Sequence, residues 1–85
     1  MSITDEVRNI VASHGKLPVD VGTLADEADL YAAGLSSFAS VQLMLALEEK
    51  FDVEFPENLL NRKTFASIAA ISAAVSGLVA DHQAA

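Results

Sequence analysis

The chain has 85 residues, a formal net charge of −7 and no cysteine. Without cysteine it can form no disulfide, no thiolate metal site and no cysteine nucleophile, so any thiol chemistry requires an attached group. The acidic balance argues against nucleic-acid binding and favours basic partners. No apolar run reaches the length of a membrane span and no basic-then-apolar leader opens the chain, so we expect a cytoplasmic protein that does not enter a membrane.

Eighty-five residues suffice for one domain with a modest core, which we expect to span residues 1–85. The two histidines, His14 and His82, belong to no cluster with metal-ligand spacing, so we expect no metal site. No acid–base pair accompanies the serines on the predicted helices, and we therefore expect no catalysis by the chain alone.

The first predicted helix runs from Ile3 to His14. Thr4 and Asp5 give its start capping or acidic character, and Gly15 is a plausible stop. One buried stripe with the spacing i, i+4, i+7, i+8 is formed by Ile3, Val7, Ile10 and Val11.

A long connection follows, from Lys16 to about Ser36. It contains Pro18, Gly22 and an acidic cluster, and connections of this length in compact domains are usually functional. We expect its apolar residues to fix it across the bundle, namely Leu17, Val19, Val21, Leu24 and Leu30.

The second predicted helix, from Ser37 to Phe51, carries two apolar arcs where a surface helix needs one. One arc holds Leu43, Met44, Leu47 and Phe51. The opposite arc holds Phe38, Val41 and Leu45 and is flanked by Gln42, Glu48 and Glu49. One arc must face the core, and the other faces solvent or a partner. The alternative, a helix buried nearly all round, is hard to arrange in so short a chain, so we favour a docking face.

Ser37 stands at the start of this helix, behind a turn at Gly34. Backbone N–H groups lack partners there and the helix dipole favours negative charge, so a phosphate on this serine would be stabilised. The alternative interpretation is an ordinary N-cap, a role that Ser36 can serve equally well.

After the second helix, Asp52 to Pro56 turn the chain. We expect one short helical turn over Glu57–Asn61, with Leu59 and Leu60 facing inward. The last helix is predicted to begin at Thr64 as N-cap and to fray near Ala80, leaving a mobile tail over residues 81–85. Four helical pieces without a strand signal predict an all-α bundle.

The segment from Asp29 to Phe51 resembles the central motif of acyl and peptidyl carrier proteins, which reads Gly-x-Asp-Ser-Leu, a valine four residues after the serine, and Leu-Glu-Glu-x-Phe. Here Val41 stands four residues after Ser37, and Leu47-Glu48-Glu49-Lys50-Phe51 closes the helix. Phe55-Pro56 and Thr64-Phe65 match later landmarks. The resemblance covers most of residues 3–79 and implies a four-helix bundle with three long helices, one short helix and a long first loop.

The resemblance also implies a site. Ser37 corresponds to the serine that a phosphopantetheinyl transferase modifies with 4′-phosphopantetheine from coenzyme A, in the presence of magnesium. The family meets its enzymes through positions that correspond to Phe38, Val41 and Leu45. The full set of residues that we expect to contact partners is Ser36, Phe38, Val41, Gln42, Leu45, Glu48 and Glu49.

Three departures from the motif make the start of this helix less acidic than usual. Ser36 replaces the aspartate, Ala39 stands where an acid is common, and Gln42 replaces a glutamate. Because carboxylates on this helix meet basic patches on many enzymes, their loss predicts a specialised carrier with few dedicated partners.

The stretch from Ala25 to Phe38 resembles the small aminoacyl carrier proteins most closely. Those are loaded with glycine or alanine by ATP-dependent amino acid:carrier protein ligases that look like truncated seryl-tRNA synthetases. The resemblance implies a monomeric carrier, not an enzyme, that holds an amino acid as a thioester for a further acceptor enzyme. Two alternatives stay open: a specialised carrier of fatty or polyketide-type acyl groups, and an unmodified helical adaptor, which the loss of the aspartate before Ser37 favours.

Overall fold

The structure is a computed structural model that describes the backbone of residues 2–84 and the side chains of residues 2–80. Its elements in chain order are α1 (Ile3–His14), the 3₁₀ turn η1 (Val21–Thr23), α2 (Ser37–Phe51), the 3₁₀ turn η2 (Glu57–Leu59) and α3 (Ile68–Ala84). No strand is present over residues 2–84. The predicted all-α fold is confirmed, with the expected short fourth helix reduced to η2, which ends before Asn61.

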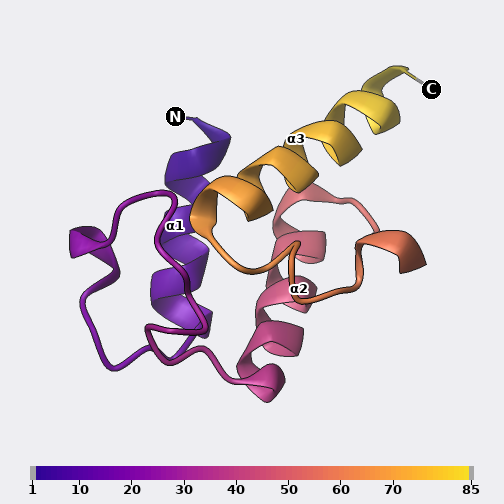
Figure 1. Cartoon of the computed structure of the whole chain (residues 1–85). Helices are drawn as coiled ribbons and strands as arrows, with labels where there is room; N and C mark the ends of the chain where they lie inside the picture. Colours follow the sequence, from indigo (N-terminus) through magenta and orange to yellow (C-terminus); the bar gives the residue numbers. More distant parts are fainter. Residues whose placement is uncertain (1, 85) are drawn as a thin grey trace.

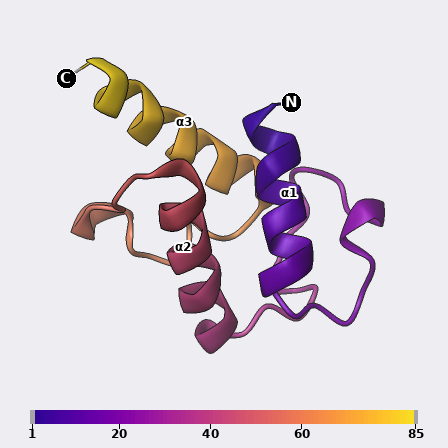
Figure 2. The ribbon, with the colours of Figure 1, turned by 180° about the vertical axis from the view of Figure 1, so that it is seen from behind.

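The three helices pack with α1 and α2 side by side in opposite directions and α3 lying obliquely against both (Figure 1). Figure 2, from behind, shows the long loop with η1 on the outer side of α1 and the segment with η2 on the far side of α2. In both views the start of α2 lies at the opposite end of the bundle from the two chain termini.

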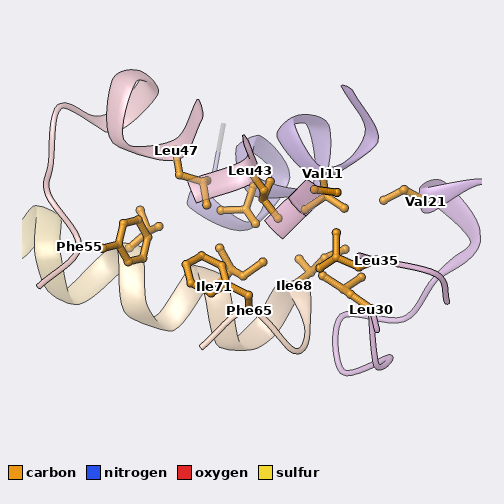
Figure 3. Packing of buried hydrophobic residues seen from close by; sticks show 13 residues of the cluster. Val11, Val21, Leu30, Leu35, Leu43, Leu47, Phe55, Phe65, Ile68 and Ile71 are labelled. Atoms are coloured by element: carbon orange, nitrogen blue, oxygen red, sulfur yellow. The ribbon is translucent and has the colours of Figure 1, made fainter. Parts of the chain in front are cut away.

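The core is formed where the three helices meet, and side chains of both long connections complete it (Figure 3). Its fully buried side chains are Val7, Val11, Leu30, Leu43, Leu47, Ile68, Ile71 and Val75. Of the stripe predicted on α1, Val7 and Val11 are buried, whereas Ile3 and Ile10 are partly exposed and pack at the margin of the core.

Helix α1 begins and ends differently in detail from the prediction. Ser2, not Thr4 or Asp5, is the N-cap, and its hydroxyl oxygen accepts a hydrogen bond from the Asp5 amide at 3.1 Å. Gly15 keeps a right-handed conformation, and the left-handed residue is Lys16, with φ of 52°. A glycine is required at position 15 for space, since a Cβ there would lie 2.7 Å from the Val11 carbonyl oxygen.

Arg8 of α1 binds the long loop between α1 and α2 at three points. Its guanidinium donates to the carbonyl oxygens of Val21 at 2.7 Å and Leu24 at 2.8 Å, and it pairs with the carboxylate of Asp26. Because one side chain satisfies three acceptors of the loop, the loop does not need every apolar side chain to be buried. The prediction that Val19 anchors the loop is wrong, as this side chain is exposed.

The remaining predicted anchors of the loop divide into two groups. Val21 and Leu30 are buried, and Leu17 and Leu24 are partly buried against the core. The loop is also joined to the segment before α3, because the Leu30 amide donates to the Ala66 carbonyl at 2.7 Å.

Helix α3 begins at Ile68 rather than at Thr64, and Ser67 acts as its cap by accepting a hydrogen bond from the Ala70 amide at 3.0 Å. Thr64 belongs instead to a turn that Asn61 organises. The Asn61 side-chain oxygen accepts from the Thr64 amide at 3.0 Å and from its hydroxyl at 3.2 Å.

Two further predictions about this half of the chain are wrong. Leu59 is partly buried, but Leu60 is 48% exposed and does not face inward. At its other end α3 continues to Ala84 instead of fraying near Ala80. Of the tail expected to be mobile, residue 85 and the side chains of residues 81–84 lie outside the described residues.

Candidate functional site

The start of α2 is set by a turn that only glycine fits. Gly34 has φ of +118°, and a Cβ at this position would lie 2.7 Å from the Cδ of Pro18. The following residue, Leu35, is buried, and its amide donates to the Leu30 carbonyl at 2.9 Å. The turn therefore fixes the point at which the chain enters α2, and with it the direction in which the next serines point.

Ser36 and Ser37 differ in what their hydroxyl groups do. Ser36 has extended backbone angles, and its oxygen accepts a hydrogen bond from the Ala39 amide at 3.0 Å, so it is the N-cap of α2. Ser37 is exposed, and its hydroxyl makes no hydrogen bond within residues 2–80. The geometry thus separates the two serines that the sequence left as alternatives for capping.

The first amide groups of α2 create an electrostatic field that favours a bound anion. The N–H groups of Ser37 and Phe38 meet no acceptor among the described residues, and the first turn holds no acidic side chain. Such unpaired N–H groups and the positive end of the helix dipole favour negative charge. A phosphate on the Ser37 oxygen would be placed in this field.

The two predicted arcs of α2 are confirmed as one buried and one exposed face. Leu43 and Leu47 are fully buried, whereas Phe38 is 68% exposed and Val41 and Leu45 are each 50% exposed. Within the described residues α2 packs against α1 and α3, and its second arc stays exposed.

Two members of the inner arc are less buried than expected. Met44 and Phe51 are partly exposed and pack at the edge of the core. Phe51 is the last residue of α2, where Asp52 takes a left-handed conformation with φ of 53° and the chain turns away, so fewer neighbours cover the ring.

The polar residues expected beside the exposed arc have different surroundings. Gln42 and Glu49 are exposed. Glu48 is half-buried, and its carboxylate accepts a hydrogen bond from the Phe55 amide at 2.9 Å. Glu48 therefore holds the turn after α2, whatever contact it makes with a partner.

A groove of about 390 Å³ runs beside Ser37, between α2 and the segment that joins η2 to α3. Its lining is largely apolar. The lining residues are Tyr31, Ser37, Ser40, Val41, Met44, Leu60, Asn61, Arg62 and Phe65. The guanidinium carbon of Arg62 lies 4.0 Å from the ring centroid of Tyr31. No local spacing in the sequence marks this pair, because the two residues lie far apart in the chain.

Comparisons with known proteins identify the family. The family described as "Phosphopantetheine attachment site" matches residues 5–75. The aminoacyl carrier protein of Agrobacterium fabrum is 65% identical over 79 residues, which are 93% of this chain and 95% of that protein. The chain therefore belongs to the phosphopantetheine-bearing carrier proteins, and within them to the aminoacyl carrier proteins. Proteins of this family bear a covalent prosthetic group and are not themselves catalysts.

Solved structures agree with this assignment. A chain in the crystal structure of an engineered Bradyrhizobium japonicum glycine:carrier protein ligase, complexed with carrier protein from Agrobacterium tumefaciens and AMP, matches with a TM-score of 0.83 and 67% identity. The match covers 86% of this chain and 97% of that one. A solution structure from Agrobacterium tumefaciens matches with a TM-score of 0.75 and 62% identity, covering 96% of this chain and 99% of that one.

The residues at the start of α2 fit a phosphopantetheine group. Ser37 offers an exposed hydroxyl that no other group of the described chain uses, next to unpaired amide donors. When bound, the group supplies the thiol that a chain without cysteine lacks.

None of the helices in the described part of the chain is long and apolar enough to cross a membrane.

Proposed function

We propose that Ser37 carries 4′-phosphopantetheine through a phosphodiester and that the thiol of this arm holds glycine or alanine as a thioester. The observation that carries the assignment to Ser37 is that the two serines at the start of α2 have different roles. Ser36 is occupied in capping the helix, whereas the Ser37 hydroxyl is exposed and unbonded among the described residues. Membership of the aminoacyl carrier proteins supports the amino-acid cargo.

Two enzymes would act on this site in sequence. A phosphopantetheinyl transferase, with coenzyme A and magnesium, would join the Ser37 oxygen to the phosphorus that carries pantetheine, and the pyrophosphate bond of coenzyme A would break with release of adenosine 3′,5′-bisphosphate. An ATP-dependent amino acid:carrier protein ligase would then activate the amino acid as its adenylate, with release of pyrophosphate, and the thiol would displace AMP to form the thioester. The structure of a glycine:carrier protein ligase with a carrier that is 67% identical to this chain supports this second partner.

The exposed face of α2 is our proposed contact surface for both enzymes. Phe38, Val41 and Leu45 give it an apolar centre, and an exposed apolar cluster beside a modification site is typical of an interaction surface. Ser36, Gln42, Glu48 and Glu49 would form its polar margin. We further propose that residues 1–85 form a single carrier domain that acts as a monomer in the cytoplasm.

The attachment site is tested by modifying purified variants. Wild type, Ser37→Ala and Ser36→Asp are incubated with coenzyme A, magnesium and a broad-specificity transferase, and each product is weighed by mass spectrometry. Ser36→Asp is the matched control, because aspartate caps a helix as well as serine and keeps α2 intact. We expect wild type and Ser36→Asp to gain the mass of the arm and Ser37→Ala to stay unmodified. Modification of Ser37→Ala would overturn the assignment.

The cargo is tested on the modified protein. With a cognate ligase and ATP, glycine or alanine should appear as a hydroxylamine-labile thioester. An acyl-carrier synthetase should load fatty acids onto the same protein poorly. Efficient fatty acylation without any aminoacylation would make the chain a specialised acyl carrier instead, and failure of the wild type to accept an arm would make it an unmodified adaptor.

A further inference from the structure

We propose that Arg62, held against the ring of Tyr31, pairs with the phosphodiester on Ser37 and thereby sets the direction in which the arm leaves α2. The inference rests on the proposed modification of Ser37. In it Arg62 is a positioning residue for the arm, and Tyr31 positions Arg62. It concerns side chains outside α2, in the first loop and in the segment after η2.

The first support is the place of Arg62 in the groove. Arg62 and Ser37 line the same groove, so the cation and the attachment oxygen border one space. A phosphodiester on Ser37 begins at the edge of this space. Arginine is the side chain best suited to phosphate, because its planar fork of N–H donors matches two phosphate oxygens at once.

The second support is that the donors of Arg62 are unused. The guanidinium lies over the Tyr31 ring, with 4.0 Å from its carbon to the ring centroid. Such stacking engages the face of the guanidinium, whereas its N–H groups point outward in its plane. Within residues 2–80 the Arg62 side chain donates no hydrogen bond and meets no carboxylate at ion-pair distance. The group is oriented by the ring and still able to bind an anion.

The third support is the hydrogen-bonded turn that presents Arg62. The Asn61 side chain closes a turn over Thr64, and the Phe65 amide donates to the Arg62 carbonyl at 3.2 Å. Phe65 itself is buried, with its ring centroid 5.4 Å from that of Phe55. Because both sides of Arg62 are fixed, little additional ordering of the backbone is needed when the side chain pairs with a phosphate.

The charge distribution of the chain favours pairing between Arg62 and the phosphodiester. The chain has a net charge of −7, so one further anion on Ser37 is placed in an unfavourable overall field. Arg8 is paired with Asp26 and Lys50 lies 3.4 Å from Glu6, so these cations are already engaged. Ser36 stands where the carrier motif has aspartate, and the first turn of α2 has no acid that would compete for Arg62.

The test compares Arg62→Gln with Lys63→Gln. Both changes remove one positive charge from an exposed residue of the same turn, but Lys63 does not line the groove. Wild type and both variants are first converted to the modified form and checked by mass. Thermal melting is then measured for each protein without and with the arm, and the phosphorus NMR resonance of the phosphodiester is recorded at low and high salt.

We expect the arm to raise the melting temperature of wild type and of Lys63→Gln, and this gain to be lost in Arg62→Gln. The phosphorus resonance should shift in Arg62→Gln relative to wild type and lose its dependence on salt, while Lys63→Gln keeps both. A merely structural role for Arg62 would lower the melting temperature with and without the arm by equal amounts. That result, or equal behaviour of the two variants, would overturn the inference while leaving the proposed function intact. Failure of wild type to gain the mass of the arm would overturn both.

Discussion

The carboxylate of Glu48 accepts a hydrogen bond from the Phe55 amide at 2.9 Å, and so ties the last turn of α2 to the chain that follows it. The Val53 amide also donates to the Glu48 carbonyl, at 3.2 Å. Phe55 is buried in the core, so its amide has little access to water. Glu48 therefore has a structural role on a helix whose acidic residues the carrier motif alone would assign to partners.

This contact predicts different effects for two neighbouring glutamates. Glu48→Ala leaves the Phe55 amide without its acceptor and should lower the free energy of unfolding by about 1–3 kcal/mol. Glu49→Ala changes an exposed side chain and should stay within about 0.5 kcal/mol of wild type. Urea denaturation of both variants measures the difference. Equal stability of the two would mean that the hydrogen bond contributes nothing to folding.

A second prediction separates the two faces of α2. Leu45→Glu changes an exposed residue and should weaken amino-acid loading by the ligase while changing stability by only about 0.5 kcal/mol. Leu47→Ala opens a cavity in the core and should cost about 2–5 kcal/mol. Melting temperature and loading rate are measured on the same preparations. If Leu45→Glu loads at the wild-type rate, this face does not bind the ligase.

The helices α1 and α2 have the bounds that the sequence predicts, because apolar residues recur at helical spacing along each of them. The cap of α1, Ser2, was not among the residues predicted to start that helix. The prediction that α3 starts at Thr64 was wrong because Thr64 and Ser67 are both good N-cap residues in the sequence. Contacts with the first loop decide between them, since the Ala69 amide donates to the Asp26 carbonyl at 2.8 Å. Because Asp26 and Ala69 are far apart in the chain, no local sequence pattern predicts this contact.

Some features of the candidate site follow from local sequence, and others depend on tertiary structure. Ser37 and the exposed arc follow from helix periodicity and from the carrier motif, both of which are local. The groove beside them depends on how the segment after η2 folds back along α2, and on the stacking of Arg62 against Tyr31. Two residues on separate connections meet only through the tertiary structure, so no reading of spacing can pair them.

A third prediction concerns the clamp that Arg8 makes on the first loop. Arg8→Met keeps much of the apolar stem but leaves the carbonyls of Val21 and Leu24 without their donor. We expect a loss of about 1–3 kcal/mol of stability and faster hydrogen exchange in residues 21–30. Lys63→Met is the control, because Lys63 is exposed and has no ion pair within residues 2–80. Unchanged exchange in the loop would show that apolar packing alone holds it.

The last prediction uses two glycines with opposite surroundings. Gly77 lies within α3, is exposed, and has open space where a Cβ would be. Gly77→Ala should therefore stabilise the protein by about 0.5–1 kcal/mol, because alanine favours helix and loses less backbone freedom on folding.

Gly34→Ala should have the opposite effect. Its φ of +118° is unfavourable for alanine, and the added Cβ would lie 2.7 Å from the Pro18 ring, which must move. Since Gly34 sets the entry into α2, the variant should also slow attachment of the arm at Ser37, whereas Gly77→Ala should leave it unchanged. Melting temperature and rate of modification are measured for both variants. Normal modification of a destabilised Gly34→Ala would show that the turn contributes to folding but does not orient the serine.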